Sequence, residues 1–113
     1  MPKTTKANKG KGRTFQQWGV KWFNNLFPEG DFTSLPMGQA GSDMVDPHHI
    51  LPWQYTEFKH WRYYPTLTEL ESIITTKKQG SPPRDVVCIV KGNYKPPLVV
   101  MPLCVLERLL EEK

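Results

Sequence analysis

The chain lacks any apolar run that approaches the roughly 20 residues needed to cross a bilayer, so we expect no transmembrane helix and no membrane contact. Its basic N-terminus is not followed by an apolar stretch, which argues against a secretory signal peptide. It has only two cysteines, Cys88 and Cys104, both among apolar neighbours. We therefore expect buried, reduced thiols in a cytoplasmic protein.

Acidic residues are absent from residues 1–13, which carry Lys3, Lys6, Lys9, Lys11 and Arg13. Since the whole chain of 113 residues has a formal charge of +4, the rest of it carries −1. The basic character therefore belongs to the N-terminus. We predict a flexible basic arm over residues 1–12 and a single domain over residues 13–113. Such an arm attracts DNA or RNA through counterion release, although a merely solubilising tail is the alternative.

The spacing of apolar residues predicts helices and strands in the order helix, three strands, helix, two strands, helix. The predicted ranges are 13–27, 31–35, 42–45, 53–60, 65–78, 85–91, 97–101 and 102–111. In the first helix, apolar residues recur at three- and four-residue steps: Phe15, Trp18, Trp22 (or Val20 and Phe23) and Leu26. We therefore expect these aromatic residues to pack in the core and not to stack on bases. The continuous apolar run 86–90 predicts a strand covered on both faces. The fold class is α/β, with one mixed five-stranded sheet flanked by helices.

Two acidic motifs occur in and next to predicted strands, Gly41-Ser42-Asp43 and Glu57-Phe58-Lys59. Side chains alternate along a strand, so one face of the second strand should carry Trp53, Tyr55, Glu57 and Lys59. If the two strands are neighbours in a hairpin, both carboxylates and the ammonium group meet. Two carboxylates beside a lysine suit a divalent metal ion and attack on a phosphodiester.

These motifs follow Lys11-Gly12 and a helix, and in that order they resemble the PD-(D/E)XK nucleases, in particular the archaeal-type and phage Holliday junction resolvases. The resemblance implies a restriction-endonuclease-like core and a metal-dependent endonuclease that is selective for DNA structure. It further implies a role in DNA recombination or processing, and the host cytoplasm as the location if a phage encodes the chain. The expected partners are branched or duplex DNA and a second copy of the chain, with the leucine-rich helix 102–111 and the loop around Trp61 as contact surfaces or as core.

The same resemblance implies a role for each motif residue. Asp43 and Glu57 would hold Mg²⁺ or Mn²⁺ together with the backbone carbonyl of Phe58, and Lys59 would orient the attacking water or stabilise the transition state. The first helix of the resolvases supplies a glutamate where this chain has Gln16, which can still form a hydrogen bond to a metal-bound water but brings no charge. The products would be a 5′-phosphate and a 3′-hydroxyl. The residues expected to contact DNA are Lys9, Lys11, Arg13, Gln39, Ser42, His60 and Arg62.

Four other interpretations stay open. The segment 46–52, Asp-Pro-His-His-Ile-Leu-Pro, is similar to the metal-binding strand of HNH nucleases, but that fold needs a later histidine on a helix and the last one here is His60. A zinc site from His48, His49, Cys88 and Cys104 lacks closely spaced pairs, and the two histidines would otherwise lie in a loop. A non-catalytic nucleic-acid-binding protein, using the run His60–Tyr64, is favoured by the missing charge at Gln16. An adaptor protein would leave the acidic motifs unexplained.

Overall fold

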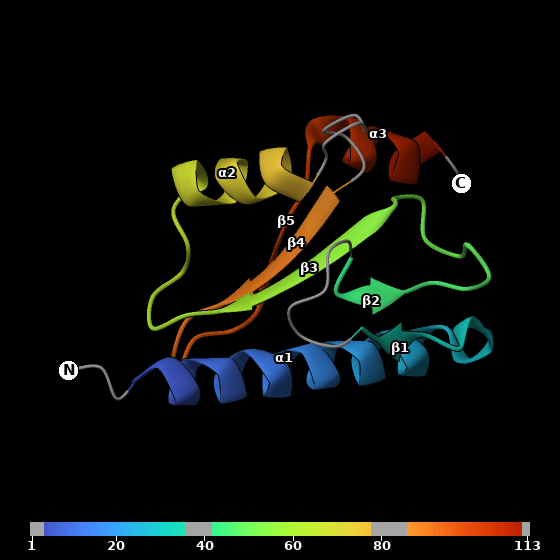
Figure 1. The fold of residues 1–113 in the computed structure, drawn as a ribbon. Coiled ribbons are helices and arrows are strands. Elements are labelled where there is room, and N and C mark those ends of the chain that lie inside the picture. The colour runs from blue at the N-terminus through green and yellow to red at the C-terminus, as the bar shows by residue number, and fades with distance from the viewer. Residues whose placement is uncertain (1–3, 36–41, 78–85, 112–113) are drawn as a thin grey trace.

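The computed structural model describes residues 4–35, 42–77 and 86–111. The elements run in the predicted order and make a mixed α/β fold (Figure 1). They are α1 (Thr4–Leu26), the 3₁₀ turn η1 (Pro28–Gly30), β1 (Thr33–Ser34), β2 (Met44–Val45), β3 (Tyr55–His60), α2 (Leu67–Lys77), β4 (Val86–Lys91), β5 (Leu98–Val100) and α3 (Leu103–Glu111).

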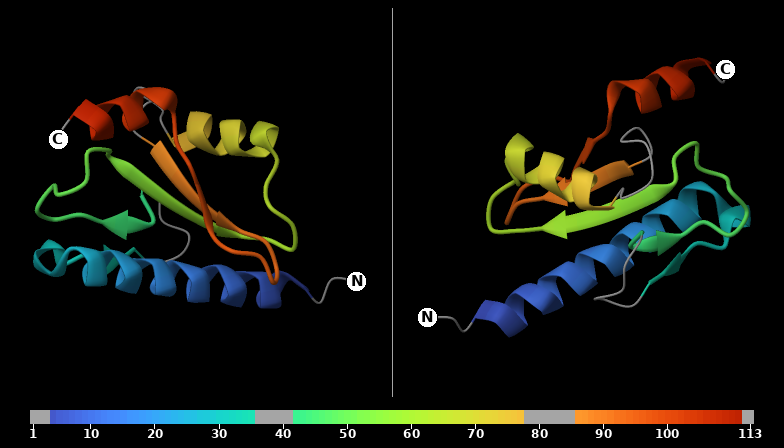
Figure 2. Two further views of the ribbon diagram at one scale, coloured as in Figure 1. Left: turned by 180° about the vertical axis from the view of Figure 1, so that it is seen from behind. Right: turned by 45° about the horizontal axis from the view of Figure 1, so that its top comes forward.

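The strands form two sheets and not the single five-stranded sheet that the sequence predicts. β3 pairs in parallel with β4, and β4 pairs antiparallel with β5, while β1 and β2 form a separate antiparallel pair. A parallel pair requires a crossover connection, and the chain between β3 and β4 passes through α2. Figures 1 and 2 show α1 along one face of the three-stranded sheet, with α2 and α3 on the opposite side.

The separation of the two sheets has a local cause at the outer edge of β3. The N–H of Asp43 donates to the carbonyl of Thr56 at 2.9 Å, which begins a ladder between the two segments. The next amides of β3 are then taken by side chains, because Ser42 Oγ accepts from the Thr56 N–H at 2.9 Å and Asp43 Oδ2 accepts from the Phe58 N–H at 2.8 Å. Backbone carbonyls of a neighbouring strand would otherwise accept these bonds.

The core lies on both faces of β3 and β4. On one face Phe58 packs against α1, with its ring centroid 5.8 Å from that of Phe15 and 6.4 Å from that of Phe23. On the other face Cys88 belongs to a buried cluster that Leu70 of α2 covers. Val86, Val87, Cys88 and Val90 are all buried, which confirms the prediction of a strand covered on both faces.

Helix α1 differs from its prediction at its start. It begins at Thr4 and not near Arg13, so residues 4–12, predicted as part of a flexible arm, continue the helix. Once a helix is nucleated, each added residue gains a hydrogen bond at little cost, and residues 4–12 contain no proline. Lys11 Nζ also donates to Asn93 Oδ1 at 3.0 Å, which joins the early turns of α1 to the far end of the sheet.

The tryptophans were also predicted wrongly. The buried positions of α1 include Phe15, Gly19 and Phe23, spaced four residues apart, whereas Trp18 and Trp22 are 42% and 47% exposed. Trp53 precedes β3 and does not share a face with Glu57, since it packs beside Phe23 on the α1 side of the sheet. A four-residue step follows one narrow face of a helix, and the bulkier indoles lie on its flank.

The structure bears on the expectations about membrane-spanning helices and about the two thiols. Of the helices in the described ranges, none has both the length and the apolar character that crossing a membrane requires. Both cysteines are free, as expected, but only Cys88 is buried and Cys104 is partly exposed.

Candidate metal and catalytic site

The segment that carries Asp43 is attached to the outer edge of β3 by its own polar groups. Ser42 Oγ accepts from the Thr56 N–H and lies 2.8 Å from the carbonyl oxygen of Met44, to which it donates. The Ser42 hydroxyl, which the sequence predicts to contact DNA, is therefore already bonded to backbone. These hydrogen bonds fix the position of the next residue, Asp43, beside β3.

The carboxylate of Asp43 lies against the middle of the Glu57-Phe58-Lys59 motif. Its Oδ2 accepts from the Phe58 N–H at 2.8 Å. In an extended strand the N–H and C=O of one residue point to the same edge, so the carbonyl of Phe58 points to the edge that Asp43 occupies. The structure thus brings together Asp43 and Phe58, two of the three groups predicted to hold a metal ion.

The third group, Glu57, is buried. Its side chain is 0% exposed, and both carboxylate oxygens are shielded from solvent. It stands in register with Cys88 of β4, on the face covered by α2, and Lys59 follows two residues later on the same face. Acidic side chains are rarely buried so completely unless other charges compensate them. Lys59 and a bound cation are both suited to that role.

The thiol of Cys88 reports the charges around it. Burial first and the negative charge of Glu57 second raise the pKa of this thiol to about 12. Lys59 acts in the opposite direction, and Asp43 adds a smaller increase of the pKa. Glu57, Lys59 and Asp43 thus all lie close enough to this thiol to affect its pKa.

The donor set fits a hard divalent cation. Two carboxylates and one backbone carbonyl are oxygen ligands of the kind that Mg²⁺ and Mn²⁺ prefer, and Mg²⁺ commonly keeps several waters beside one or two carboxylates. Within residues 4–35, 42–77 and 86–111, no group of three or more His, Cys, Asp or Glu side chains is placed to hold a metal ion. The predicted site needs only two such side chains.

Gln16 serves as a brace in this structure. Its side chain is buried, and Nε2 lies 2.8 Å from the carbonyl oxygens of both Leu35 and Asp43 and 2.6 Å from Ser34 Oγ. The amide therefore ties α1 to the backbone of the residue that supplies the site's carboxylate. A glutamate at this position would set its oxygens against two carbonyl oxygens, which is a local structural reason for an amide here.

The histidine segment forms a loop, which the sequence analysis gave as the alternative to a zinc site, and not the strand that an HNH nuclease needs. Asp46 closes this loop, because its two carboxylate oxygens accept from the N–H groups of Ile50 and Leu51 at 3.0 and 2.8 Å. His48 pairs with Asp31 at 2.9 Å on the surface. A zinc cluster of these histidines with the two cysteines does not occur among the described residues.

Of the remaining predicted DNA contacts, Lys11, His60 and Arg62 fall at one end of the molecule. Lys11 Nζ donates to Asn93 Oδ1 at 3.0 Å, and His60 Nε2 lies 3.1 Å from the same oxygen. Arg62 is exposed just beyond His60, and Arg13 is exposed on α1. Lys9 also lies on α1, whereas Gln39 falls outside the described residues.

Sequence reasoning missed part of this basic end. Lys91 acts electrostatically on His60: burial lowers the pKa of His60 first, Lys91 lowers it next, and the Asn93 hydrogen bond opposes them. The sequence predicts a strand before and after the turn 92–95, Gly-Asn-Tyr-Lys, but indicates no role for the turn itself. Its exposed tyrosine and lysine, unusual for a simple turn, were the signal that could have identified it.

Comparisons with protein-family models, curated proteins and solved structures found no match. The resemblance to the PD-(D/E)XK nucleases accordingly depends on the order and spacing of the motifs, and the candidate site depends on the geometry of the residues around β3.

Proposed function

We propose that the protein is a metal-dependent endonuclease that hydrolyses DNA phosphodiester bonds and selects its substrate by DNA structure, as Holliday junction resolvases do. The observation that carries the proposal is the 2.8 Å hydrogen bond from the Phe58 N–H to Asp43 Oδ2, which holds one carboxylate beside the Glu57-Phe58-Lys59 motif. The biological role that fits is recombination or processing of phage or mobile-element DNA.

The chemistry follows from the positions of the four groups. Asp43, Glu57 and the Phe58 carbonyl would hold Mg²⁺ or Mn²⁺, which when bound supplies an activated water and offsets charge on the phosphate. Lys59 adds a positive charge on the same face as Glu57, where it can orient the water or stabilise the anionic transition state. Because Glu57 is buried, these charges interact through a medium less polar than water, which strengthens their effect.

A branched substrate calls for two sites with matching geometry, which a two-fold dimer provides. Helix α3 supports a dimer in the proposal, since its apolar side chains Leu103, Leu106 and Leu110 are exposed while Val105 is buried. The leucine surface that was predicted to form the dimer contact is therefore exposed to solvent.

The test is cleavage of labelled four-way junction, flap, single-stranded and linear duplex DNA in Mg²⁺, Mn²⁺ or EDTA. Asp43→Asn and Lys59→Ala should each lower the metal-dependent rate at least about 100-fold, since each removes a charge at the reacting group. Asp31→Asn and Lys21→Gln are matched controls, because they remove exposed charges on other elements. Cleavage that survives in Asp43→Asn would contradict the proposal.

A binding protein without cleavage is the second candidate, and Gln16 is the observation that favours it. Its amide is committed to backbone carbonyls, so α1 brings no negative charge to the site. If no substrate is cut in any metal while wild type and Asp43→Asn bind DNA equally, this candidate replaces the nuclease.

A further inference from the structure

Three segments without acidic residues meet at one end of the molecule. The sequence has no Asp or Glu in residues 1–28, 58–68 or 86–106. The ends of β3 and β4 and the loops that follow them join α1 there, through the bond between Lys11 and Asn93. We call this end the tip and define it by Lys11, the loop 60–64 and the loop 91–96. Its basic side chains are Lys11, His60, Arg62, Lys91 and Lys95.

The two loops of the tip are held together by hydrogen bonds. The N–H of Asn93 donates to the carbonyl of Arg62, and the N–H of Trp61 donates to the carbonyl of Lys91, each at 3.1 Å. The hydroxyl of Tyr64 donates to the carbonyl of Pro96 at 2.7 Å. These bonds fix the loops before any ligand arrives, which lowers the entropic cost of binding.

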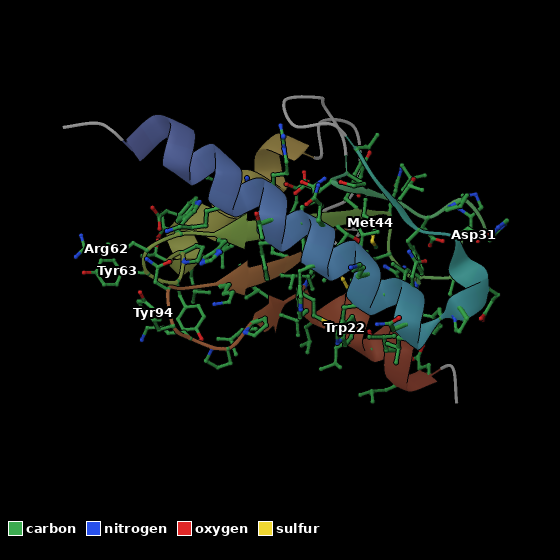
Figure 3. All side chains as sticks on the ribbon, turned by 90° about the horizontal axis from the view of Figure 1, so that it is seen from below. Trp22, Asp31, Met44, Arg62, Tyr63 and Tyr94 are labelled. Carbon is green, nitrogen blue, oxygen red and sulfur yellow. The ribbon has the colours of Figure 1, made fainter. Side chains whose placement is uncertain are left out.

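Aromatic rings project from this ordered base into solvent. Tyr63 is 66% exposed, Tyr94 is fully exposed, and the Arg62 guanidinium lies 5.4 Å from the centroid of the Tyr63 ring. Figure 3 shows Arg62, Tyr63 and Tyr94 together at this end, away from Trp22 and Asp31. Tyr94 has a φ of 60°, a left-handed conformation that is uncommon for a bulky residue. Exposed rings on a rigid base that packing does not require indicate a binding surface.

A hollow continues this surface toward α1. It has a volume of about 330 Å³ and lies between the tip and the first half of the helix. Trp18 forms one wall, and His60 and Lys91 line the end nearest the tip. The half-exposed indole of Trp18 thus extends the aromatic surface, and Lys91 supplies charge beside it.

We propose that the tip binds unpaired nucleotides of DNA, with Tyr63 and Tyr94 stacking on exposed bases and Arg62, Lys91 and Lys95 contacting phosphates. Base stacking on aromatic side chains requires bases that have left the duplex, whereas phosphate contacts alone would serve a duplex equally well. A purely electrostatic surface would have no use for two exposed tyrosines.

This inference rests on the proposed function for its biological meaning, because it names the substrate as DNA in which a duplex meets a single strand. His60 follows Glu57 by three residues along β3, or about 10 Å of extended chain. That length corresponds to about three stacked base pairs. A single-stranded segment on the tip would therefore place nearby duplex at the candidate site.

Binding is measured by fluorescence anisotropy in EDTA, where no cleavage occurs, with a blunt duplex, the same duplex carrying a single-stranded tail, and the tail alone. Wild type should prefer the tailed duplex to the blunt one. Tyr63→Ala and Tyr94→Asn should each weaken binding to the tailed DNA about 10-fold, since each removes one stacked base contact, and should leave the blunt duplex unchanged. Asn is chosen because it tolerates a positive φ.

The cations are tested by salt dependence. Arg62→Gln and Lys95→Gln should each reduce the slope of log affinity against log salt by about 0.7, the value for one phosphate contact on a single strand. Trp22→Ala and Lys21→Gln control for loss of an exposed ring and an exposed charge elsewhere on α1. Circular dichroism and thermal midpoints confirm that each variant is folded.

The outcomes separate the two proposals. If the Tyr63→Ala/Tyr94→Asn double variant keeps the wild-type preference for tailed DNA, the tip inference fails, whatever the cleavage assay shows. If no DNA is cut yet the preference depends on both tyrosines, the nuclease proposal fails and the tip inference stands. Binding to phosphatidylserine vesicles that the double variant loses, with unchanged DNA binding, would assign the tip to membranes and also overturn the inference.

Discussion

At the scale of single residues, Cys88 gives a direct readout of the charges at the candidate site. Its folded pKa of about 12 lies above its ordinary value of 9.0, because burial and Glu57 disfavour the thiolate. A raised folded pKa contributes stability below pH 9, and this stability is lost as the pH rises from 9 toward 12. Between these two pH values the Cys88 thiol loses its proton in the unfolded chain and keeps it in the native protein, and this difference lowers the free energy of unfolding.

We predict that Cys88 does not react with a thiol reagent at pH 8 in the native protein, whereas the partly exposed Cys104 reacts. Native Cys104→Ser should therefore show no reactive thiol until denaturant is added, and Cys88→Ser should react at once. Rapid native modification of Cys88 would contradict the burial and electrostatics described for β4.

Gln16 offers a second prediction at this scale. Gln16→Glu should lower the free energy of unfolding by about 1–3 kcal/mol, because a buried donor becomes an acceptor facing the carbonyls of Leu35 and Asp43. The neighbouring Gln17 is exposed, so Gln17→Glu is the matched control and should change stability little. Urea denaturation measures both, and equal effects at the two positions would contradict the bracing role.

At the scale of elements, the packing of α1 on the sheet depends on one glycine. A Cβ added at Gly19 would lie 2.1 Å from the Phe58 ring, far inside van der Waals contact. We expect Gly19→Ala to lower the unfolding free energy by about 1–3 kcal/mol through overpacking, although alanine is the better helix former. Gly12→Ala in the same helix controls for helix propensity. Thermal unfolding that is unchanged or raised in Gly19→Ala would rule out the close contact.

The elements themselves were largely predictable from the sequence, since each has its own periodic signal. The strands at 55–60 and 86–91 and the helices at 67–77 and 103–111 lie within or close to their predicted ranges. The division into two sheets was not predictable, because it depends on the side chains of Ser42 and Asp43 bonding to β3 amides in place of a strand. Residue types alone do not determine which acceptor a backbone N–H will bond to.

The candidate site, like the fold, was predictable from the sequence only in part. The sequence predicts that Asp43, Glu57 and Lys59 come together, from strand alternation and the order of motifs, and the structure places Asp43 at the Phe58 N–H between the other two. It did not predict that Gln16 would bond to backbone. The brace is set by the exact approach of α1 to β1 and β2, which no local pattern encodes.

At the scale of the whole molecule, the distance between the tip and the candidate site predicts where a strand is cut. On duplexes with a single-stranded tail, nicks should cluster at one fixed position, at least about three base pairs from the point where the strands separate, since Tyr63 lies beyond His60 and each pair adds about 3.4 Å. Denaturing gels of end-labelled DNA map the position to one nucleotide. Nicks spread evenly along the duplex, or unchanged in position by Tyr63→Ala/Tyr94→Asn, would be incompatible with a tip that positions the substrate.

The tip itself could not be foreseen as one surface. Lys11 and Asn93 are 82 positions apart in sequence, and their contact becomes visible only when α1 lies along the sheet. The run His60–Tyr64 was recognisable as basic and aromatic, but Tyr94 belongs to a separate turn, and no local pattern places that turn beside the run. Global topology, and not local pattern, determined that these segments meet.

The hydrogen bonds that hold Asp43 also occupy the outer edge of β3, so that a strand of another molecule cannot pair with it. A strand edge with free amides can template pairing with a second chain, which is a route to aggregation. Here the amides of Thr56 and Phe58 are already occupied by Ser42 and Asp43. Asp43, a residue predicted to bind the metal, thus also blocks the strand edge at which another chain could pair and aggregate. Replacing Asp43 by alanine would free the Phe58 amide for such pairing, whereas asparagine would keep an acceptor in place.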